Sequence, residues 1–241
     1  MTVLLALEHV SKSFGSLKVT DDLSFTLGKG EALGVIGPNG AGKTTMFNLI
    51  TGDLQPDAGD VLFEGHSIAG LSPAARCRAG IGRSYQIPHP FAGMTVFENV
   101  LVGGTFGAAR HEAEAVDVAV EILERTGLIG KANLLAGALT LLDRKRLELA
   151  RALATNPTLL LLDEIAGGLT EHEVHALVET INEIRTEGVS IIWIEHIVHA
   201  LMAVVDRLIA IDFGRLLMEG DPADVMASDA VREIYMGISV E

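Results

Sequence analysis

Hydrophobic and polar positions alternate in two stretches near the beginning of the chain. Leu4 to Val10 and Leu23 to Leu27 show this period of two, which predicts half-buried strands with a turn at Gly15-Ser16 between them. An unbroken apolar run at Ala32–Ile36 predicts a fully buried strand. Met46 to Ile50 have the pattern of the first turns of a helix, so this part of the chain is predicted to run strand, loop, helix.

Helical and strand patterns alternate along the rest of the chain, which predicts a mostly parallel sheet covered by helices on both faces. The segment from about residue 66 to 157 is mainly helical, so we expect a helical subdomain inserted into that sheet. The further predicted strands are Asp60–Glu64, Thr158–Asp163, Val189–Ile194, Arg207–Asp212 and Leu216–Glu219. The further predicted helices are Leu71–Gly80, Glu112–Thr126, Arg144–Thr155, Glu171–Thr186, Ile197–Val205 and a terminal helix from Pro222 to Glu241.

The strongest chemical signal is the loop between the buried strand and its helix, which matches G-x-x-x-x-G-K-[ST], a pattern that cradles nucleotide phosphates. Glycines let the backbone fold around a polyanion, and the following helix presents its positive end to the same place. We expect Lys43 to reach the β- and γ-phosphates and the Thr44 hydroxyl to ligate Mg²⁺. The alternative is a glycine-rich turn without a ligand, which the flanking strand and helix disfavour. The residues expected at the phosphates are Gly37, Pro38, Asn39, Gly40, Ala41, Gly42, Lys43, Thr44 and Thr45.

A second chemical element is a strand that ends in two acids. The leucines Leu159–Leu162 place Asp163 at the carboxyl end of a buried strand, where ligands bind in open α/β sheets. An aspartate at this point can hold Mg²⁺ directly or through water, and Glu164 can polarise an attacking water as a general base. The alternative is a strand that simply ends in solvated acids, and the phosphate-binding loop upstream favours the functional interpretation.

Composition limits the kinds of partner. The formal net charge of −14 argues against a nucleic-acid-binding surface and against docking on anionic lipid by charge alone. We therefore expect any association with a membrane to go through a protein partner. The single cysteine, Cys77, excludes an internal disulfide and fits a reduced, cytosolic setting. We find neither an apolar stretch near the roughly 18 residues of a membrane span nor an export signal.

Residues 4 to 240 resemble the ATPase subunit of an ATP-binding cassette (ABC) transporter, and within that family the ATPases of branched-chain amino acid and amide importers. The resemblance implies an α/β P-loop NTPase fold in one nucleotide-binding domain, residues 1–241, with a mostly parallel core sheet, an antiparallel N-terminal β subdomain and the inserted helical subdomain. It rests on an ordered series of motifs at Gly37–Thr45, Ser84–Gln86, Arg146–Leu153, Leu159–Glu164 and Glu195–His196.

The resemblance also implies roles for single residues. Phe14 takes the position whose ring stacks on adenine, with a core phenylalanine at a strand end as the alternative. Gln86 matches a glutamine that joins the Mg²⁺ or water shell and whose loop links the nucleotide to the transmembrane partner. His196 matches a histidine that contacts the γ-phosphate and the region of the Glu164 carboxylate. The implied catalytic residues are Glu164, His196 and Gln86, and the implied Mg²⁺ ligands are Thr44, Gln86 and Asp163.

The chain departs from the family pattern in two places. The signature segment, usually L-S-G-G-Q, is here Leu139–Asp143, in which Thr140 keeps a hydroxyl that can bind a phosphate of a facing subunit. Both glycines are absent, and Asp143 adds a negative charge unless it caps the following helix and points away. In the loop after Glu164, Gly167–Thr170 replaces a segment that usually ends in aspartate, and we expect Thr170 to cap the next helix.

The resemblance implies a subunit that binds and hydrolyses ATP with Mg²⁺ and powers uptake of branched-chain amino acids or related amino acids and amides. The implied partners are a second ATPase subunit, two transmembrane permease subunits and, indirectly, a solute-binding protein, at the cytoplasmic face of the inner membrane. One alternative is a soluble ABC ATPase of DNA repair or translation, without a permease. Another is a P-loop kinase or GTPase outside the ABC family, although we find no guanine-selecting N-K-x-D segment.

Overall fold

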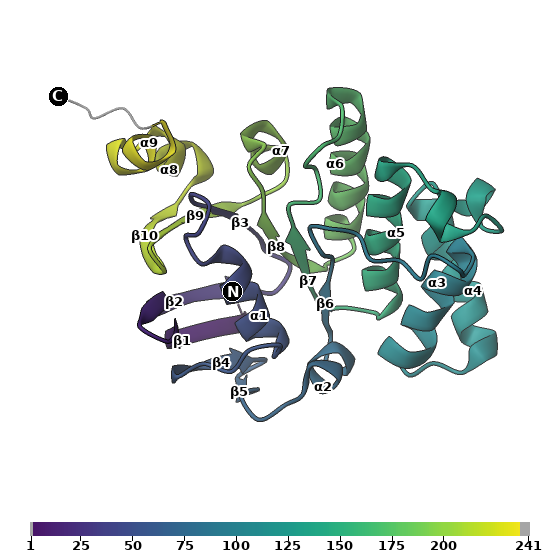
Figure 1. The fold of residues 1–241 in the computed structure, drawn as a ribbon, viewed down its shortest axis with the longest axis horizontal. Coiled ribbons are helices and arrows are strands. Elements are labelled where there is room, and N and C mark those ends of the chain that lie inside the picture. The colour runs from purple at the N-terminus through teal and green to yellow at the C-terminus, as the bar shows by residue number, and fades with distance from the viewer. Residues whose placement is uncertain (1, 237–241) are drawn as a thin grey trace. The chain divides into compact units, whose positions relative to one another are not determined.

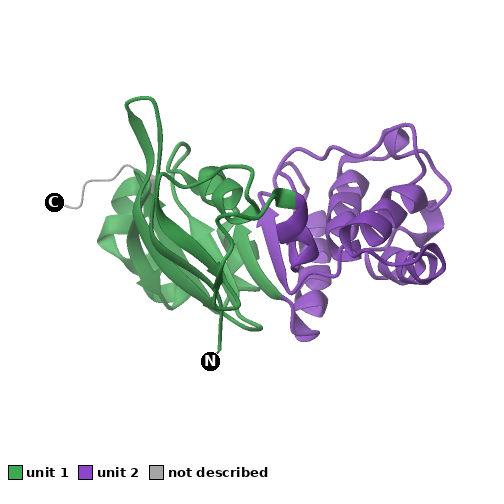
Figure 2. Cartoon of the chain, turned by 90° about the horizontal axis from the view of Figure 1, so that it is seen from below, with its two compact units in different colours: residues 1–73, 190–241 green, residues 74–189 purple. Residues whose placement is uncertain are grey.

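The computed structural model describes residues 2–236, and these form two compact units. Unit 1 comprises residues 1–73 and 190–241, and unit 2 comprises residues 74–189 (Figure 2). The part of the predicted terminal helix after residue 236 lies outside the described residues. Unit 1 thus combines the two ends of the chain, whereas unit 2 is one continuous segment.

Unit 1 contains an antiparallel sheet of four strands in the order β2-β1-β4-β5 (Figure 1). The strand pair β1 and β2 turns at Gly15, whose φ of 60° suits glycine. Both strands extend beyond the predicted segments, because backbone pairing between polar residues such as Ser13 and Lys18 continues where the apolar alternation stops. The strands are β1 (Val3–Phe14), β2 (Leu17–Gly28), β4 (Ala58–Phe63) and β5 (His66–Ser67).

A second set of strands in unit 1 runs in the order β10-β9-β3-β8. The buried strand β3 (Ala32–Ile36) pairs in parallel with both β8 and β9, while β9 and β10 form an antiparallel hairpin. The predicted terminal helix is wrong as a single element: it consists of two helices, because Ser228 is extended between them and accepts from the Val231 N–H. The other elements are β8 (Ser190–Ile194), β9 (Arg207–Asp212), β10 (Arg215–Gly220), α1 (Lys43–Thr51), α7 (Val198–Met202), α8 (Pro222–Ala227) and α9 (Asp229–Met236).

Unit 2 combines a parallel pair of strands with most of the helices (Figure 1). The strand β6 (Ile81–Arg83) was not predicted, because three residues are too few to show a periodicity. The helical segments α3, α4 and α5 pack against one another inside the segment predicted to be a helical subdomain, whose boundaries remain a prediction. The remaining elements are β7 (Leu159–Asp163), α2 (Pro73–Arg78), α3 (Val96–Val102), the π-helix η1 (Gly103–Gly107), α4 (Glu112–Arg125), the short 3₁₀ helices η2 (Ile129–Lys131) and η3 (Ala136–Ala138), α5 (Leu141–Ala154) and α6 (Glu171–Thr186).

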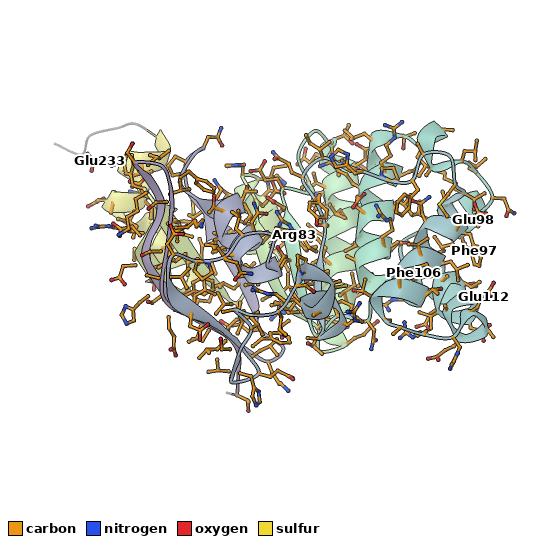
Figure 3. All side chains as sticks on the ribbon, turned by 60° about the horizontal axis from the view of Figure 1, so that its bottom comes forward. Arg83, Phe97, Glu98, Phe106, Glu112 and Glu233 are labelled. Carbon is orange, nitrogen blue, oxygen red and sulfur yellow. The ribbon has the colours of Figure 1, made fainter. Side chains whose placement is uncertain are left out.

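Two helices in unit 2 differ from the sequence prediction, one in its start and the other in its existence. The helix predicted from Arg144 begins at Leu141, because Thr140 caps it and accepts from the Asp143 N–H. The helix α3, which carries Glu98 (Figure 3), was not predicted although its start has a capping box. Among the residues that the structure describes, none of the helices has the length and apolar character needed to span a bilayer.

The capping box of α3 gives a test of how this helix is held. Thr95 accepts from the Glu98 N–H at 3.1 Å, and Glu98 accepts from the Thr95 N–H at 2.7 Å. We expect Thr95→Ala to lower the free energy of unfolding by about 1 kcal/mol in urea denaturation, because a helix cap is lost. Thr186→Ala is the control, since its hydroxyl bonds back to the Glu183 carbonyl within its own helix. Equal stability of Thr95→Ala and wild type would contradict a capping role.

Candidate functional site

The predicted phosphate-binding loop, in unit 1, is folded around its own lysine. The Lys43 ammonium donates to the Gly37 carbonyl at 2.7 Å and to the Pro38 carbonyl at 3.0 Å. Lys43 is buried at the start of α1, whereas Thr44 beside it is exposed. Gly42 caps α1 and has no side chain that could occupy the N–H groups of the first turn. The start of α1 therefore offers N–H groups and the positive end of a helix to an anion.

Two glycines of this loop lie too close to neighbouring backbone to be replaced by any other residue. A Cβ atom on Gly37 would lie 2.2 Å from the Ile211 carbonyl oxygen, and one on Gly42 would lie 2.4 Å from that of Val19. The Gly214 N–H also donates to the Ala41 carbonyl at 2.9 Å. Packing against β2 and β9 therefore fixes the conformation of the loop.

Unit 1 also holds Phe14 and His196. Phe14 ends β1 and is 49% exposed, which excludes the alternative of a core phenylalanine. The strands β3 and β8 are adjacent and parallel, with Val35 opposite Ile194, so the loop of Lys43 and the segment of His196 leave the sheet at the same edge. His196 is exposed, and its N–H donates to the Glu195 carboxylate at 2.9 Å.

Unit 2 contains the second group of predicted residues, at the ends of another pair of parallel strands. Arg83, labelled in Figure 3, ends β6 and its Nη2 atom donates to Asp163 Oδ2, at the end of β7, at 3.1 Å. The Arg83 and Asp163 side chains are 5% and 2% exposed, so this is a buried ion pair. The guanidinium also lies 4.8 Å from the centroid of the Tyr85 ring. Arg83 thus compensates the charge of a carboxylate that burial alone would disfavour.

Glu164, the predicted general base, is held at both its side chain and its backbone. Its Oε2 atom accepts from Gln86 Nε2 at 2.5 Å, and its carbonyl oxygen accepts from Lys145 Nζ at 3.1 Å. Its φ of 46° lies in the left-handed region, which a residue with a side chain adopts only when its surroundings hold it there. The structure therefore brings three predicted residues, Asp163, Glu164 and Gln86, together in unit 2.

In the signature segment, at the start of α5, Thr140 and Asp143 are hydrogen-bonded to each other and Asp143 also contacts Lys131. Besides capping α5, the Thr140 hydroxyl donates to Asp143 Oδ2 at 2.8 Å, and Lys131 Nζ lies 2.5 Å from the same oxygen. Burial by itself would raise the pKa of Asp143, but the hydrogen bonds from Lys131 and Thr140 outweigh it and hold that pKa below its ordinary value. Asp143 is therefore an anion that points to Lys131. Because a hydroxyl has only one proton to donate, Thr140 would have to leave Asp143 before it could donate to a phosphate.

The loop after Glu164 behaves as predicted at its end. Thr170 caps α6 and forms a capping box with Glu173, so the prediction of a cap at Thr170 is confirmed.

Within residues 2–236 there is no group of three or more His, Cys, Asp or Glu side chains that could hold a metal ion. The predicted Mg²⁺ ligands Thr44, Gln86 and Asp163 nevertheless fit this ion chemically, because Mg²⁺ takes oxygen donors and keeps several waters beside substrate phosphates.

Comparison with known proteins identifies the family. The ABC transporter family model matches residues 20–167, which is more than half of the chain. The matched range contains the loop of Lys43, Gln86, the signature segment and the end of β7. The chain belongs to the ABC transporter family. The predicted family and fold class are confirmed, and so, at the level of the family, is the prediction of a transport ATPase.

Relatives of similar length are ATP-binding proteins of transport systems. The chain is 36% identical to the high-affinity branched-chain amino acid transport ATP-binding protein LivG of Salmonella typhimurium, over 97% of this chain and 98% of that one. It is 32% identical to the lipopolysaccharide export system ATP-binding protein LptB of Haemophilus influenzae, over 98% of each. Among solved structures, the ADP conformation of an ATP-binding cassette of an ABC transporter matches with a TM-score of 0.89 at 31% identity, covering 99% of this chain and all of the other.

Three basic residues that contact the predicted site residues or the signature segment could not be recognised from the sequence. Arg83, Lys131 and Lys145 contact Asp163, Asp143 and the Glu164 backbone respectively. Their contacts join residues far apart in the chain, so no local spacing marks them. The only sequence signal was indirect: acids expected in a buried setting, such as Asp163, need a cation nearby.

The ion pair of Asp143 gives a pH-dependent prediction. A carboxyl group whose folded-state pKa is depressed adds stability above its ordinary pKa of 3.8, and that stability is lost as the pH falls through the lower folded value. We expect Asp143→Asn to lower the free energy of unfolding by about 1–3 kcal/mol at neutral pH, because a charged hydrogen-bond acceptor is lost. The difference from wild type, measured in urea, should shrink once the pH falls below 3.8.

Asp117→Asn is the matched control, since Asp117 is an exposed aspartate in the same unit and should give a small difference. A difference between wild type and Asp143→Asn that stays constant down to the lowest pH at which the protein folds would show that the charge of Asp143 does not stabilise the signature segment.

Proposed function

We propose that this chain is the ATP-hydrolysing subunit of an importer that takes up branched-chain amino acids or related amino acids and amides. The observation that best supports ATP hydrolysis is that, within each unit, two adjacent parallel strands end beside each other. In unit 1, β3 and β8 deliver the Lys43 loop and His196 to one edge, and in unit 2, β6 and β7 deliver Gln86 and Glu164 to another. Ligands bind at such edges in α/β proteins.

The nucleotide is bound by unit 1 in this proposal. The backbone of Gly37–Thr45 and the Lys43 ammonium hold the phosphates, and the half-exposed ring of Phe14 stacks on adenine. Lys43 already donates to two carbonyls of its own loop, so binding exchanges these contacts for contacts with phosphate oxygens. Because the loop is shaped by packing of its glycines, little ordering is needed when the anion arrives.

Mg²⁺ would be held by the exposed hydroxyl of Thr44, the Asp163 carboxylate and the Gln86 amide oxygen, together with waters. When bound, the ion supplies positive charge that neutralises the phosphate oxygens. Arg83 compensates the charge of the Asp163 carboxylate in its buried position. Gln86 donates its amide N–H to Glu164, and this bond does not use the amide oxygen that is the proposed ligand.

Hydrolysis in this proposal depends on the placement of one water. The Glu164 carboxylate polarises that water, and His196 contacts the γ-phosphate that the water attacks. The Gln86 amide fixes the carboxylate through the 2.5 Å hydrogen bond to Oε2. Catalysis is then mainly a matter of positioning and of charge compensation at the phosphate.

Two ATPase subunits form a dimer in this proposal, with the signature segment of each facing the nucleotide of the other. Thr140 is the proposed phosphate contact of this segment, and it must exchange its hydrogen bond to Asp143 for one to the phosphate. The pairing of Asp143 with Lys131 keeps the carboxylate from repelling the phosphate as an isolated charge.

The permease partners and the solute are proposed from the relatives. The full-length match to LivG supports a role in uptake of branched-chain amino acids or similar compounds through two transmembrane permease subunits, with a solute-binding protein as an indirect partner. The relatives named above belong to transport systems, which disfavours a soluble ATPase of DNA repair or translation. The subunit would lie at the cytoplasmic face of the inner membrane, attached through the permeases.

A substitution of the proposed base separates binding from hydrolysis. Glu164→Gln keeps the shape of the side chain but cannot take a proton, so turnover should fall by about 10²- to 10⁴-fold while ATP still binds. With ATP and Mg²⁺ the variant should accumulate as a dimer in size-exclusion chromatography. Lys43→Ala should instead lose most nucleotide affinity, measured by calorimetric titration, because the ammonium contact to the phosphates is removed.

Glu171→Gln provides the control, because Glu171 is an exposed glutamate at the start of α6 and its loss should leave turnover unchanged. Normal ATP hydrolysis by Glu164→Gln would refute the assignment of the base. Absence of adenine nucleotide binding by the wild type, with Mg²⁺ present, would refute the proposed function as a whole.

The transport role has a separate test. We expect the tagged chain to copurify from detergent-solubilised membranes with polytopic permease subunits, and cells lacking it to lose uptake of radiolabelled leucine, isoleucine or valine. Complementation with Glu164→Gln should restore the complex but not the uptake, because assembly does not require hydrolysis. If no permease copurified, the result would favour the soluble ATPase. If the uptake of all three amino acids were unchanged, the solute would have to be another amino acid or an amide.

A further inference from the structure

A buried lysine of α5, Lys145, lies next to the backbone of the proposed general base. Lys145 is only 4% exposed, although lysine is among the residues least often buried. Taking an ammonium group out of water is unfavourable unless polar atoms compensate it. One compensating atom is the Glu164 carbonyl oxygen, 3.1 Å from Lys145 Nζ, so the ammonium contacts the backbone of the proposed base.

The backbone at that point needs to be held. Glu164 has a φ of 46°, and a left-handed conformation is unfavourable for a residue with a side chain. The Glu164 carbonyl also accepts from the Gly167 N–H, but at 3.4 Å, which is longer than the contact with Lys145. Lys145 is thus the closer of these two donors that fix the orientation of the peptide group following Glu164.

The orientation of this peptide group affects the carboxylate. The Glu164 carboxylate accepts a hydrogen bond from Gln86 Nε2, and hydrogen bonds depend on the direction of donor and acceptor. If the backbone of Glu164 relaxed from its left-handed conformation, the side chain would leave from Cα in another direction, and the contact with Gln86 would be lost. Gln86 at the carboxylate and Lys145 at the carbonyl therefore both restrain the position of this residue.

We propose that Lys145 is a positioning residue that holds the general base Glu164 in place from the signature helix α5. This inference rests on the proposed function, because it assigns Lys145 a role only if Glu164 polarises the attacking water. Lys145 lies in the same helix that Thr140 caps, so one rigid element carries both the signature segment and the anchor of the base. A displacement of α5 would thus move the backbone of Glu164 directly.

The first experiment measures steady-state ATP hydrolysis and nucleotide binding of Lys145→Met. The methionine fills a similar volume but has no donor, so kcat should fall by about 10- to 100-fold through misplacement of the base. The nucleotide affinity and KM should stay within about two-fold of wild type, because no contact with nucleotide is lost. Lys145→Arg, which keeps a donor, should recover a large part of kcat.

Arg110→Met is the matched control, because Arg110 Nη1 donates to the Ala154 carbonyl at the other end of α5, at 3.3 Å, and contacts no proposed site residue. It should leave kcat unchanged. If Lys145→Met does not fold, Lys145→Gln replaces it, since its shorter side chain keeps an N–H donor that cannot reach the Glu164 carbonyl.

The second experiment asks whether Lys145 acts through Glu164. In single-turnover measurements, Lys145→Met should have little further effect in a Glu164→Gln background, because the base that it positions is already absent. Hydrogen exchange of the nucleotide-free protein should show faster exchange of the amides of residues 164–168 in Lys145→Met, and wild-type rates there in Arg110→Met.

Unchanged kcat in Lys145→Met, an equal fall in both backgrounds, or unchanged exchange at residues 164–168 would each overturn the proposal. These results differ from a failure of the proposed function, which would appear as a wild-type protein that does not bind nucleotide or as a Glu164→Gln variant that turns over normally.

Discussion

The site depends first on a phosphate-binding loop whose conformation is fixed by packing. Gly37 and Gly42 sit so close to the carbonyls of Ile211 and Val19 that a single added carbon would force the backbone apart. The Lys43 ammonium completes the loop from inside by donating to two of its carbonyls. A loop held in this way needs little further ordering when it receives an anion, so more of the interaction energy is expressed as affinity.

The second half of the chemistry depends on charge compensation in unit 2. Asp163, Asp143 and the Glu164 backbone each contact a basic side chain, namely Arg83, Lys131 and Lys145. In a chain with a net charge of −14, Arg83 and Lys131 compensate the charges of two buried acids, whereas Lys145 holds a backbone carbonyl. The altered signature segment follows the same logic, because the acid that replaces a neutral amide is paired with Lys131 and bonded to the cap of its own helix.

Much of the fold could be predicted from local patterns, and the elements that could not be predicted have physical reasons. The strand Ala32–Ile36 was predicted with the bounds that the structure has, because an apolar run beside a glycine loop has few other solutions. The strand β6 and the helix α3 were not predicted, because the first is very short and the second is marked only by its capping box. The terminal helix was predicted as one element, although Ser228 divides it, because a serine is compatible with a helix interior as well as with a cap.

The sequence by itself determined the family and the order of the motifs, because glycine, lysine and acid at fixed spacings are local requirements of phosphate and metal chemistry. It also determined the cap at Thr170, which needs only residues within one turn. Only the tertiary structure decided that Asp143 turns to Lys131, that Arg83 neutralises Asp163 and that Lys145 reaches the backbone of Glu164. These contacts join side chains that are distant in sequence, and their geometry is set by how strands and helices pack rather than by the residues next to them.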